Sequence, residues 1–158
     1  MSINILQSAP NFTLYNSEKE EVSLNDFKGS KNVLLLFFPM AFTSTCTEEL
    51  CAVRDDIARY NNSNAQVIGI SVDSVFTLAK YKEEQKYNFP LLSDFNKEVS
   101  SAYESLYEFF TPMMLKGVSK RAAFIIDKTG ILQYKEILES AGEIPNFKVI
   151  NEKLESLN

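Results

Sequence analysis

The chain has 158 residues, of which 45% are hydrophobic and 23% are charged, a composition typical of a folded globular protein. This length favours one domain, residues 1–158, with room for a sizeable core. The net charge is −5 and no stripe of Lys and Arg is visible, which argues against nucleic acid and anionic membranes as partners. No signal-peptide pattern and no apolar run of the roughly 20 residues that span a bilayer is apparent, so we expect a cytoplasmic protein.

The chain contains two cysteines and no histidine. Without histidine, Ser-His-Asp triads, Cys-His dyads and histidine-based metal sites are excluded. Two cysteines are too few for a structural zinc or a disulfide scaffold, so we expect no metal and no cofactor. A close pair of cysteines in a reducing compartment favours redox chemistry. Any nucleophile must then be activated by a helix dipole, backbone amides or an arginine.

Taken in chain order, the first third of the sequence leads up to one strong strand. Residues 9–14 predict a short strand, and residues 22–29 predict a turn or a single helical turn that a glycine ends. Residues 32–38 are a nearly continuous apolar run and predict a central strand that is buried on both faces. An amphipathic helix is predicted next, over residues 44–61.

The rest of the chain alternates strands and helices and then closes with a hairpin and a helix. The predicted elements are a strand over 66–72, a helix over 74–87, a short strand over 89–94, a helix over 96–103, a loop over 104–118, a hairpin over 121–137 and a helix over 143–157. A βαβ unit followed by ββα predicts an α/β protein of thioredoxin-like fold, in which helices flank a central mixed sheet.

Cys46 lies in the first turn of the helix predicted over residues 44–61. The helix dipole and the unpaired N–H groups of a first turn favour thiolate over thiol, so Cys46 is a candidate nucleophile. It also shares a helix face with three apolar residues, and a small buried side chain is the competing interpretation. The neighbours favour the nucleophile, because Pro39 positions the entering loop and Thr43 offers a hydroxyl that can hold a polar substrate.

Cys51 follows five residues later, about 140° around the helix and away from the predicted core face. Helical positions five apart have Cα atoms about 8–9 Å apart, whereas a disulfide needs at most about 6.8 Å. A bond between Cys46 and Cys51 therefore requires the first helical turn to unwind. From the residues alone, Cys51 is either a resolving cysteine or an inert small side chain.

The motif Pro39-x-x-x-Thr43-x-x-Cys46 resembles the active-site signature of the peroxiredoxins, which are thiol peroxidases of thioredoxin-like fold in the AhpC/TSA superfamily. The resemblance extends along much of the chain, through residues 9–12, 37–43, 46–49, 89–94 and 121–127. The segments around the cysteine are similar to the Q-type (bacterioferritin-comigratory) and AhpE-like branches.

This resemblance implies that the Cys46 thiolate attacks hydrogen peroxide or an organic hydroperoxide and becomes a sulfenic acid. It also implies that Thr43 and Arg121 hold the two peroxide oxygens, and a protonated arginine can stabilise both the thiolate and the leaving oxygen. The competing interpretation of Arg121 is a surface ion pair at the start of a strand. Glu49 is implied to orient an arginine, and its competing interpretation is a solvated helix residue.

The two branches differ in how the sulfenic acid is reduced. The Q-type branch has the same C-x4-C spacing, which implies that Cys51 resolves the sulfenic acid as a disulfide and that thioredoxin or a similar dithiol recycles the enzyme. The AhpE-like branch implies a one-Cys mechanism with an external thiol. A thioredoxin-like disulfide reductase needs Cys-x-x-Cys and usually a tryptophan, and this chain has neither. A non-enzymatic binding module leaves the set Pro39, Thr43, Cys46 and Arg121 unexplained.

The irregular segment over residues 104–118 contains four large apolar side chains, Phe109, Phe110, Met113 and Met114. They could surround an apolar substrate, form a dimer contact or only anchor a loop. The resemblance implies a monomer or a dimer that pairs through loops around the active site, and the apolar tract from Phe109 to Met114 favours the homodimer here.

Overall fold

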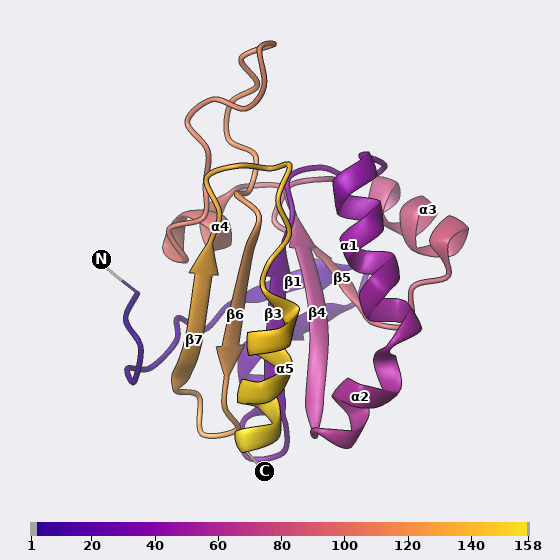
Figure 1. Ribbon diagram of the computed structural model, residues 1–158. Helices are drawn as coiled ribbons and strands as arrows, with labels where there is room; N and C mark the ends of the chain where they lie inside the picture. The colour runs from indigo at the N-terminus through magenta and orange to yellow at the C-terminus, as the bar shows by residue number, and fades with distance from the viewer. Residues whose placement is uncertain (1–2, 158) are drawn as a thin grey trace.

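The computed structural model describes residues 3–157 and builds them around a seven-stranded mixed sheet (Figure 1). Its strands are β1 (Thr13–Asn16), β2 (Glu21–Ser23), β3 (Asn32–Phe37), β4 (Ala65–Ser71), β5 (Leu91–Ser93), β6 (Ala122–Ile126) and β7 (Leu132–Ile137). They lie in the order β2-β1-β5-β4-β3-β6-β7. β4 runs parallel to both β3 and β5, and the other neighbours are antiparallel.

Helices cover both faces of this sheet. They are the 3-10 helix η1 (Leu24–Phe27) and the α-helices α1 (Ser44–Asp55), α2 (Ile57–Asn62), α3 (Val75–Gln85), α4 (Glu98–Ala102) and α5 (Phe147–Ser156). One apolar cluster joins the sheet to α1, α2, α3 and α5, and a second joins it to η1 and α4. The predicted thioredoxin-like α/β fold is confirmed. Within residues 3–157, none of these helices combines the length and apolar character needed to cross a membrane.

β3 is the centre of the core, as its apolar run predicts. All six of its residues are buried, because successive side chains of a strand point to opposite faces and both faces are covered. Leu34 and Leu36 join the cluster under α1, while Leu35 and Phe37 join the cluster on the other face.

The helix predicted over residues 44–61 is interrupted, so the prediction of one continuous helix is wrong. Asp56 has φ −114° and ψ 23°, and it separates α1 from α2. Its carboxylate accepts a hydrogen bond from Nε of Arg59 at 2.7 Å. Aspartate favours helix boundaries because its short side chain competes for backbone and nearby donors.

Two further differences lie near the ends of the chain. The turn predicted over residues 22–29 contains η1 but also most of β2, which pairs with β1 through Leu14 and Val22. The last helix begins at Phe147, so the helix predicted over residues 143–157 starts four residues too early, and Ile144 lies before the helix and is exposed. The short β2 has too little alternation to be recognised from its sequence.

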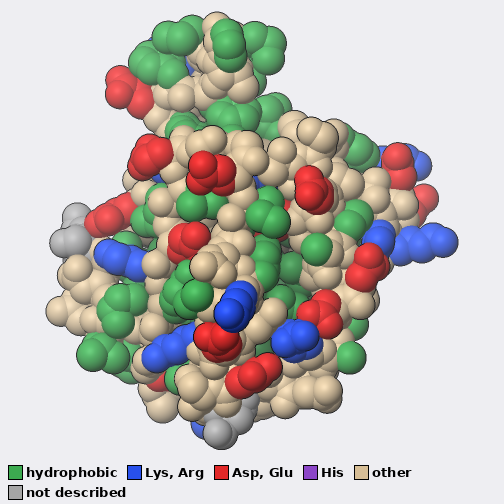
Figure 2. Space-filling model, in the orientation of Figure 1, with side chains coloured by type: hydrophobic (Ala, Val, Ile, Leu, Met, Phe, Trp, Pro, Cys, Tyr) green, Lys and Arg blue, Asp and Glu red, His purple; other side chains and the backbone are tan. Residues whose placement is uncertain are grey.

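Residues 106–119, predicted mainly as loop, form a β-hairpin-like arm that projects from the sheet (Figure 1). Phe110 and Leu115 exchange backbone hydrogen bonds of 2.7 and 3.0 Å. Thr111 and Met114 close its turn with positive φ values of 65° and 56°. Its tip carries exposed apolar side chains, which Figure 2 shows standing clear of the body.

Candidate active site

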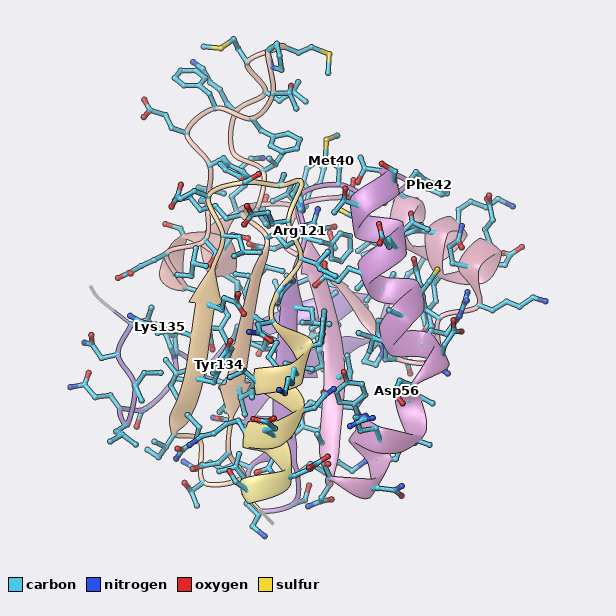
Figure 3. The ribbon with its side chains drawn as sticks, viewed as in Figure 1. Met40, Phe42, Asp56, Arg121, Tyr134 and Lys135 are labelled. Carbon is cyan, nitrogen blue, oxygen red and sulfur yellow. The ribbon has the colours of Figure 1, made fainter. Side chains whose placement is uncertain are left out.

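The predicted site residues gather where β3 ends and β6 begins. β3 and β6 are antiparallel neighbours, and Phe37 pairs with Ala122. This register brings Arg121, the residue before β6, beside the loop that follows β3. Figure 3 shows Arg121 between the base of the arm and α1. β4 is parallel to β3 and ends at the same edge, so the loop after β4 also faces the site.

The loop of residues 39–43 is held in one conformation before α1 begins. Pro39 is buried, and the Ala41 N–H donates to Oδ2 of Asp73 at 2.8 Å. Phe42 has a φ of 68°, a left-handed conformation that costs energy in a residue other than glycine. The fixed loop places Thr43 at the N-cap of α1.

The Thr43 hydroxyl donates its hydrogen to the carbonyl oxygen of Met40 at 2.8 Å. A hydroxyl has one donor hydrogen and two acceptor lone pairs. Because the hydrogen is engaged, Thr43 can accept a hydrogen bond from a substrate. A hydroperoxide carries such a donor on its terminal oxygen.

Cys46 is fully buried in the first turn of α1. The Nη2 group of Arg121 donates to its Sγ at 3.2 Å. Arg121 is itself only 1% exposed, so the interpretation of this residue as a surface ion pair is wrong. A helix start and a buried guanidinium both stabilise a thiolate. Cys46 also packs in the core cluster, so its sulfur is both buried and in contact with the Arg121 guanidinium.

The Arg121 guanidinium is held from three sides. Nη1 donates to Oε1 of Glu49 at 2.8 Å, and both Nε and Nη2 donate to the carbonyl oxygen of Ala141, at 3.3 and 2.9 Å. Burial lowers the pKa of Arg121, but the facing Cys46 and Glu49 outweigh it and raise that pKa above its ordinary value. The guanidinium therefore stays protonated and is fixed in direction.

Glu49 is completely buried, so its interpretation as a solvated helix residue is wrong. Its Oε2 has no hydrogen-bond partner within the described part of the chain. Burial raises the pKa of Glu49 to about 7, Arg121 opposes that rise and the nearby Glu136 adds to it. This carboxyl group therefore changes its charge near neutral pH.

Cys51 is half-buried and faces the end of α3. Its thiol donates to Oε1 of Gln85 at 3.5 Å and lies 3.9 Å from the Tyr87 hydroxyl. Both cysteines are free thiols, and α1 runs without interruption through both. Cys46 and Cys51 lie on different sides of α1, as predicted. The side that carries Cys51 packs against α3.

Three contributors to this site were not found from the sequence. Asp73, two residues after β4, holds the loop at Ala41, and its signal is a polar residue following a buried strand parallel to β3. Tyr81 shares a 2.9 Å hydrogen bond with Thr47. Ala141 acts through its carbonyl oxygen, which has no side-chain signal.

Among residues 3–157, no group of three or more Cys, Asp and Glu side chains is placed to hold a metal ion.

A model of the AhpC/TSA family matches residues 5–135. The chain belongs to the AhpC/TSA family. This family member is 34% identical over 157 residues to alkyl hydroperoxide reductase E of Mycobacterium tuberculosis, with 98% of each chain covered. It is 37% identical over 147 residues to the chloroplastic 2-cysteine peroxiredoxin of Chattonella marina, covering 87% of this chain and 72% of the relative.

Solved structures agree with the family assignment. Peroxidoxin BcpB from Mycobacterium tuberculosis superposes with a TM-score of 0.85 at 25% identity, with 99% of both chains covered. A PrxQ mutant from Xylella fastidiosa superposes with a TM-score of 0.86 at 22% identity, covering 99% of this chain and 98% of that one, and this likeness concerns the fold. As a member of the AhpC/TSA family with peroxiredoxin relatives, the chain is a thiol-dependent peroxidase.

Proposed function

We propose that Cys46 is the thiol that this peroxidase uses to reduce hydrogen peroxide and organic hydroperoxides. The observation that carries the proposal is the 3.2 Å contact between the Arg121 guanidinium and Sγ of Cys46 at the start of α1. The thiolate attacks the terminal oxygen of the hydroperoxide, so that an S–O bond forms and the O–O bond breaks. The leaving oxygen takes a proton and departs as water or alcohol.

The neighbouring residues each contribute to this step. Thr43 accepts a hydrogen bond from the hydroperoxide, because its own hydrogen is engaged by Met40. Arg121 stabilises the thiolate and then the negative charge on the leaving oxygen. Pro39 shapes the loop that carries Thr43, and Glu49 fixes the direction of the Arg121 guanidinium.

For the next step we propose that Cys51 attacks the Cys46 sulfenic acid and forms a disulfide, with loss of water. The hydrogen bonds that its thiol makes with Gln85 and Tyr87 are long, at 3.5 and 3.9 Å, so they hold the Cys51 thiol only weakly. The intact helix between the two cysteines favours a second possibility, in which an external thiol reduces the sulfenic acid directly. In either case thioredoxin, a similar dithiol or a small thiol supplies the electrons, in a reducing compartment such as the cytoplasm.

Intact mass after addition of peroxide to the reduced protein tests both steps. The wild type should lose about 2 Da as a disulfide, and Cys51→Ser should gain about 16 Da as a sulfenic acid. Cys46→Ser should consume no peroxide above the buffer rate. Peroxide consumption by Cys46→Ser at the wild-type rate would refute the role of Cys46, whereas a gain of about 16 Da by the wild type would refute only the resolving role of Cys51.

We also propose that the arm joins two copies of this chain. It projects from the body, and Phe109, Met113 and Met114 are exposed at 42%, 73% and 56%, more apolar surface than a free segment usually presents. Light scattering should give the mass of a dimer for the wild type and of a monomer for Met113→Glu. A monomeric wild type at micromolar concentration would refute this pairing and leave the peroxidase proposal unaffected.

A further inference from the structure

One buried cation lies between two buried acids in this site. Arg121 contacts Sγ of Cys46 through Nη2 and Oε1 of Glu49 through Nη1. Cys46 and Glu49 are three residues apart on α1, so they lie on the same side of that helix. Neither is exposed to solvent.

A single guanidinium can balance one negative charge at this depth. A buried carboxylate that lacks its own partner is costly, and a second nearby anion raises that cost. Glu49 fits this description, because its Oε2 has no hydrogen-bond partner within residues 3–157. While Cys46 is a thiolate, the favourable form of Glu49 is therefore the neutral acid.

The other charged and titratable groups near Glu49 do not change this balance. Glu136 on β7 adds a further negative charge, and burial raises the pKa of Glu49 to about 7 despite the opposing Arg121. Tyr60 on α2 also faces Glu49, and its own pKa is raised to about 12, chiefly by burial. Tyr60 is therefore neutral at physiological pH and supplies no charge.

Oxidation reverses the situation at Cys46. The sulfenic acid is neutral, so the Arg121 charge becomes available to Glu49 alone, through the contact that already exists at 2.8 Å. At the same moment the leaving oxygen needs a proton. The carboxyl proton of Glu49 is the one that the site can then release.

We propose that Glu49 is the proton reserve of the peroxidase step, so that the negative charge passes from Cys46 to Glu49 while Arg121 stays in place. In balanced form, a thiolate, a neutral Glu49 and a hydroperoxide give a sulfenic acid, an ionised Glu49 and water or an alcohol. The site as a whole takes no proton from solvent. This inference rests on the proposed role of Cys46.

Proton uptake measured during a single turnover tests this inference. The parent is the Cys51→Ser variant, which stops at the sulfenic acid, mixed with hydrogen peroxide and a pH indicator in weak buffer near pH 6.5. We expect about zero protons taken up per sulfenic acid in the parent and about one in the parent carrying Glu49→Gln, because glutamine has no proton to release. The matched control is Glu48→Gln, an exposed acid on the same helix, which should behave as the parent.

Two further measurements test the proposal if Glu49→Gln folds poorly. Glu49→Asp retains an acid and should keep uptake near zero. In the parent itself, uptake should rise to about one proton above roughly pH 8.5, where Glu49 is already ionised before the reaction. Equal uptake with and without Glu49 at pH 6.5, or no rise with pH in the parent, would overturn the proposal. A parent that gains no sulfenic acid by mass would instead refute the peroxidase role of Cys46.

Discussion

The hydroxyl groups of Thr47 and Tyr81 lie 2.9 Å apart and share a hydrogen bond. This bond joins the first turn of α1 to the middle of α3. Tyr81 is fully buried, and its ring packs against Phe42 at 4.9 Å and Tyr87 at 5.1 Å between centroids. Thr47 is the residue next to Cys46. This bond therefore holds in place the helical turn that must open before Cys46 can reach Cys51.

Replacing Tyr81 by Phe should speed disulfide formation. A neutral hydrogen bond contributes about 1 kcal/mol, which corresponds to roughly a fivefold change in the population of the open turn. After one equivalent of peroxide, the disulfide should therefore form several-fold faster than in the wild type, and overoxidised Cys46 should decrease. Quenched-flow alkylation followed by mass analysis measures both quantities.

The matched control for this change is Tyr103→Phe. Tyr103 is equally buried but lies in the cluster on the other face of the sheet, where its hydroxyl donates to the carbonyl oxygen of Pro10 at 2.6 Å. An equal acceleration by Tyr103→Phe would mean that general loss of stability, and not the contact with Thr47, controls the opening.

Arg121→Lys should lower the second-order rate constant for peroxide by roughly 100-fold or more, the cost typical of losing a preorganised donor to a developing negative charge. A lysine keeps the positive charge but cannot contact Cys46, Glu49 and Ala141 at once with a planar fork. Stopped-flow competition for peroxide measures this loss. Arg59→Lys, on the exposed side of α2, should leave the rate unchanged.

Thr43→Val and Thr43→Ser separate the hydroxyl of Thr43 from its shape. Valine keeps the shape and removes the acceptor, so we expect a loss of roughly 10-fold to 100-fold in kcat/KM, in line with a hydrogen bond to a charged transition state. Serine keeps the hydroxyl and should stay within a few-fold of the wild type. If both variants lose activity equally, the methyl contact and not the hydroxyl is what Thr43 contributes.

The ionisation of Glu49 should make the stability of the reduced protein depend on pH. The pKa of Glu49 is about 7 in the folded protein against 4.5 for an ordinary glutamate. The Glu49 carboxyl group therefore binds its proton more tightly in the folded protein than in the unfolded chain. Its contribution to the free energy of unfolding decreases as the pH rises from 4.5 to 7. Relative to wild type, Glu49→Gln should gain about 2–3 kcal/mol in free energy of unfolding between pH 5 and pH 8.

Urea unfolding of the reduced proteins at several pH values measures this difference. Glu48→Gln serves as the control, because Glu48 is exposed beside the same helix turn, and its difference from wild type should not vary with pH. A constant difference for Glu49→Gln as well would show that Glu49 is ionised throughout this range.

Several features of this protein follow from local sequence alone. The apolar run of β3 predicted its central place, and the position of Cys46 in a first helical turn predicted its environment, because both signals extend over only a few residues. The spacing of Pro39, Thr43 and Cys46 was enough to indicate the family. The break at Asp56 was missed because the apolar period continues across it while one polar residue leaves the helical conformation.

Only the tertiary structure determined how Arg121, Cys46 and Glu49 lie relative to one another. Arg121 reaches Cys46 across 75 residues and Glu49 across 72, and only the register of β6 beside β3 brings these side chains together. The Ala141 carbonyl completes the set and has no signature in a sequence, since every residue carries one. Sequence alone therefore pointed to Cys46 as the candidate nucleophile. The fold determined that a single buried arginine is shared between this thiol and a carboxyl group with no other partner among the described residues.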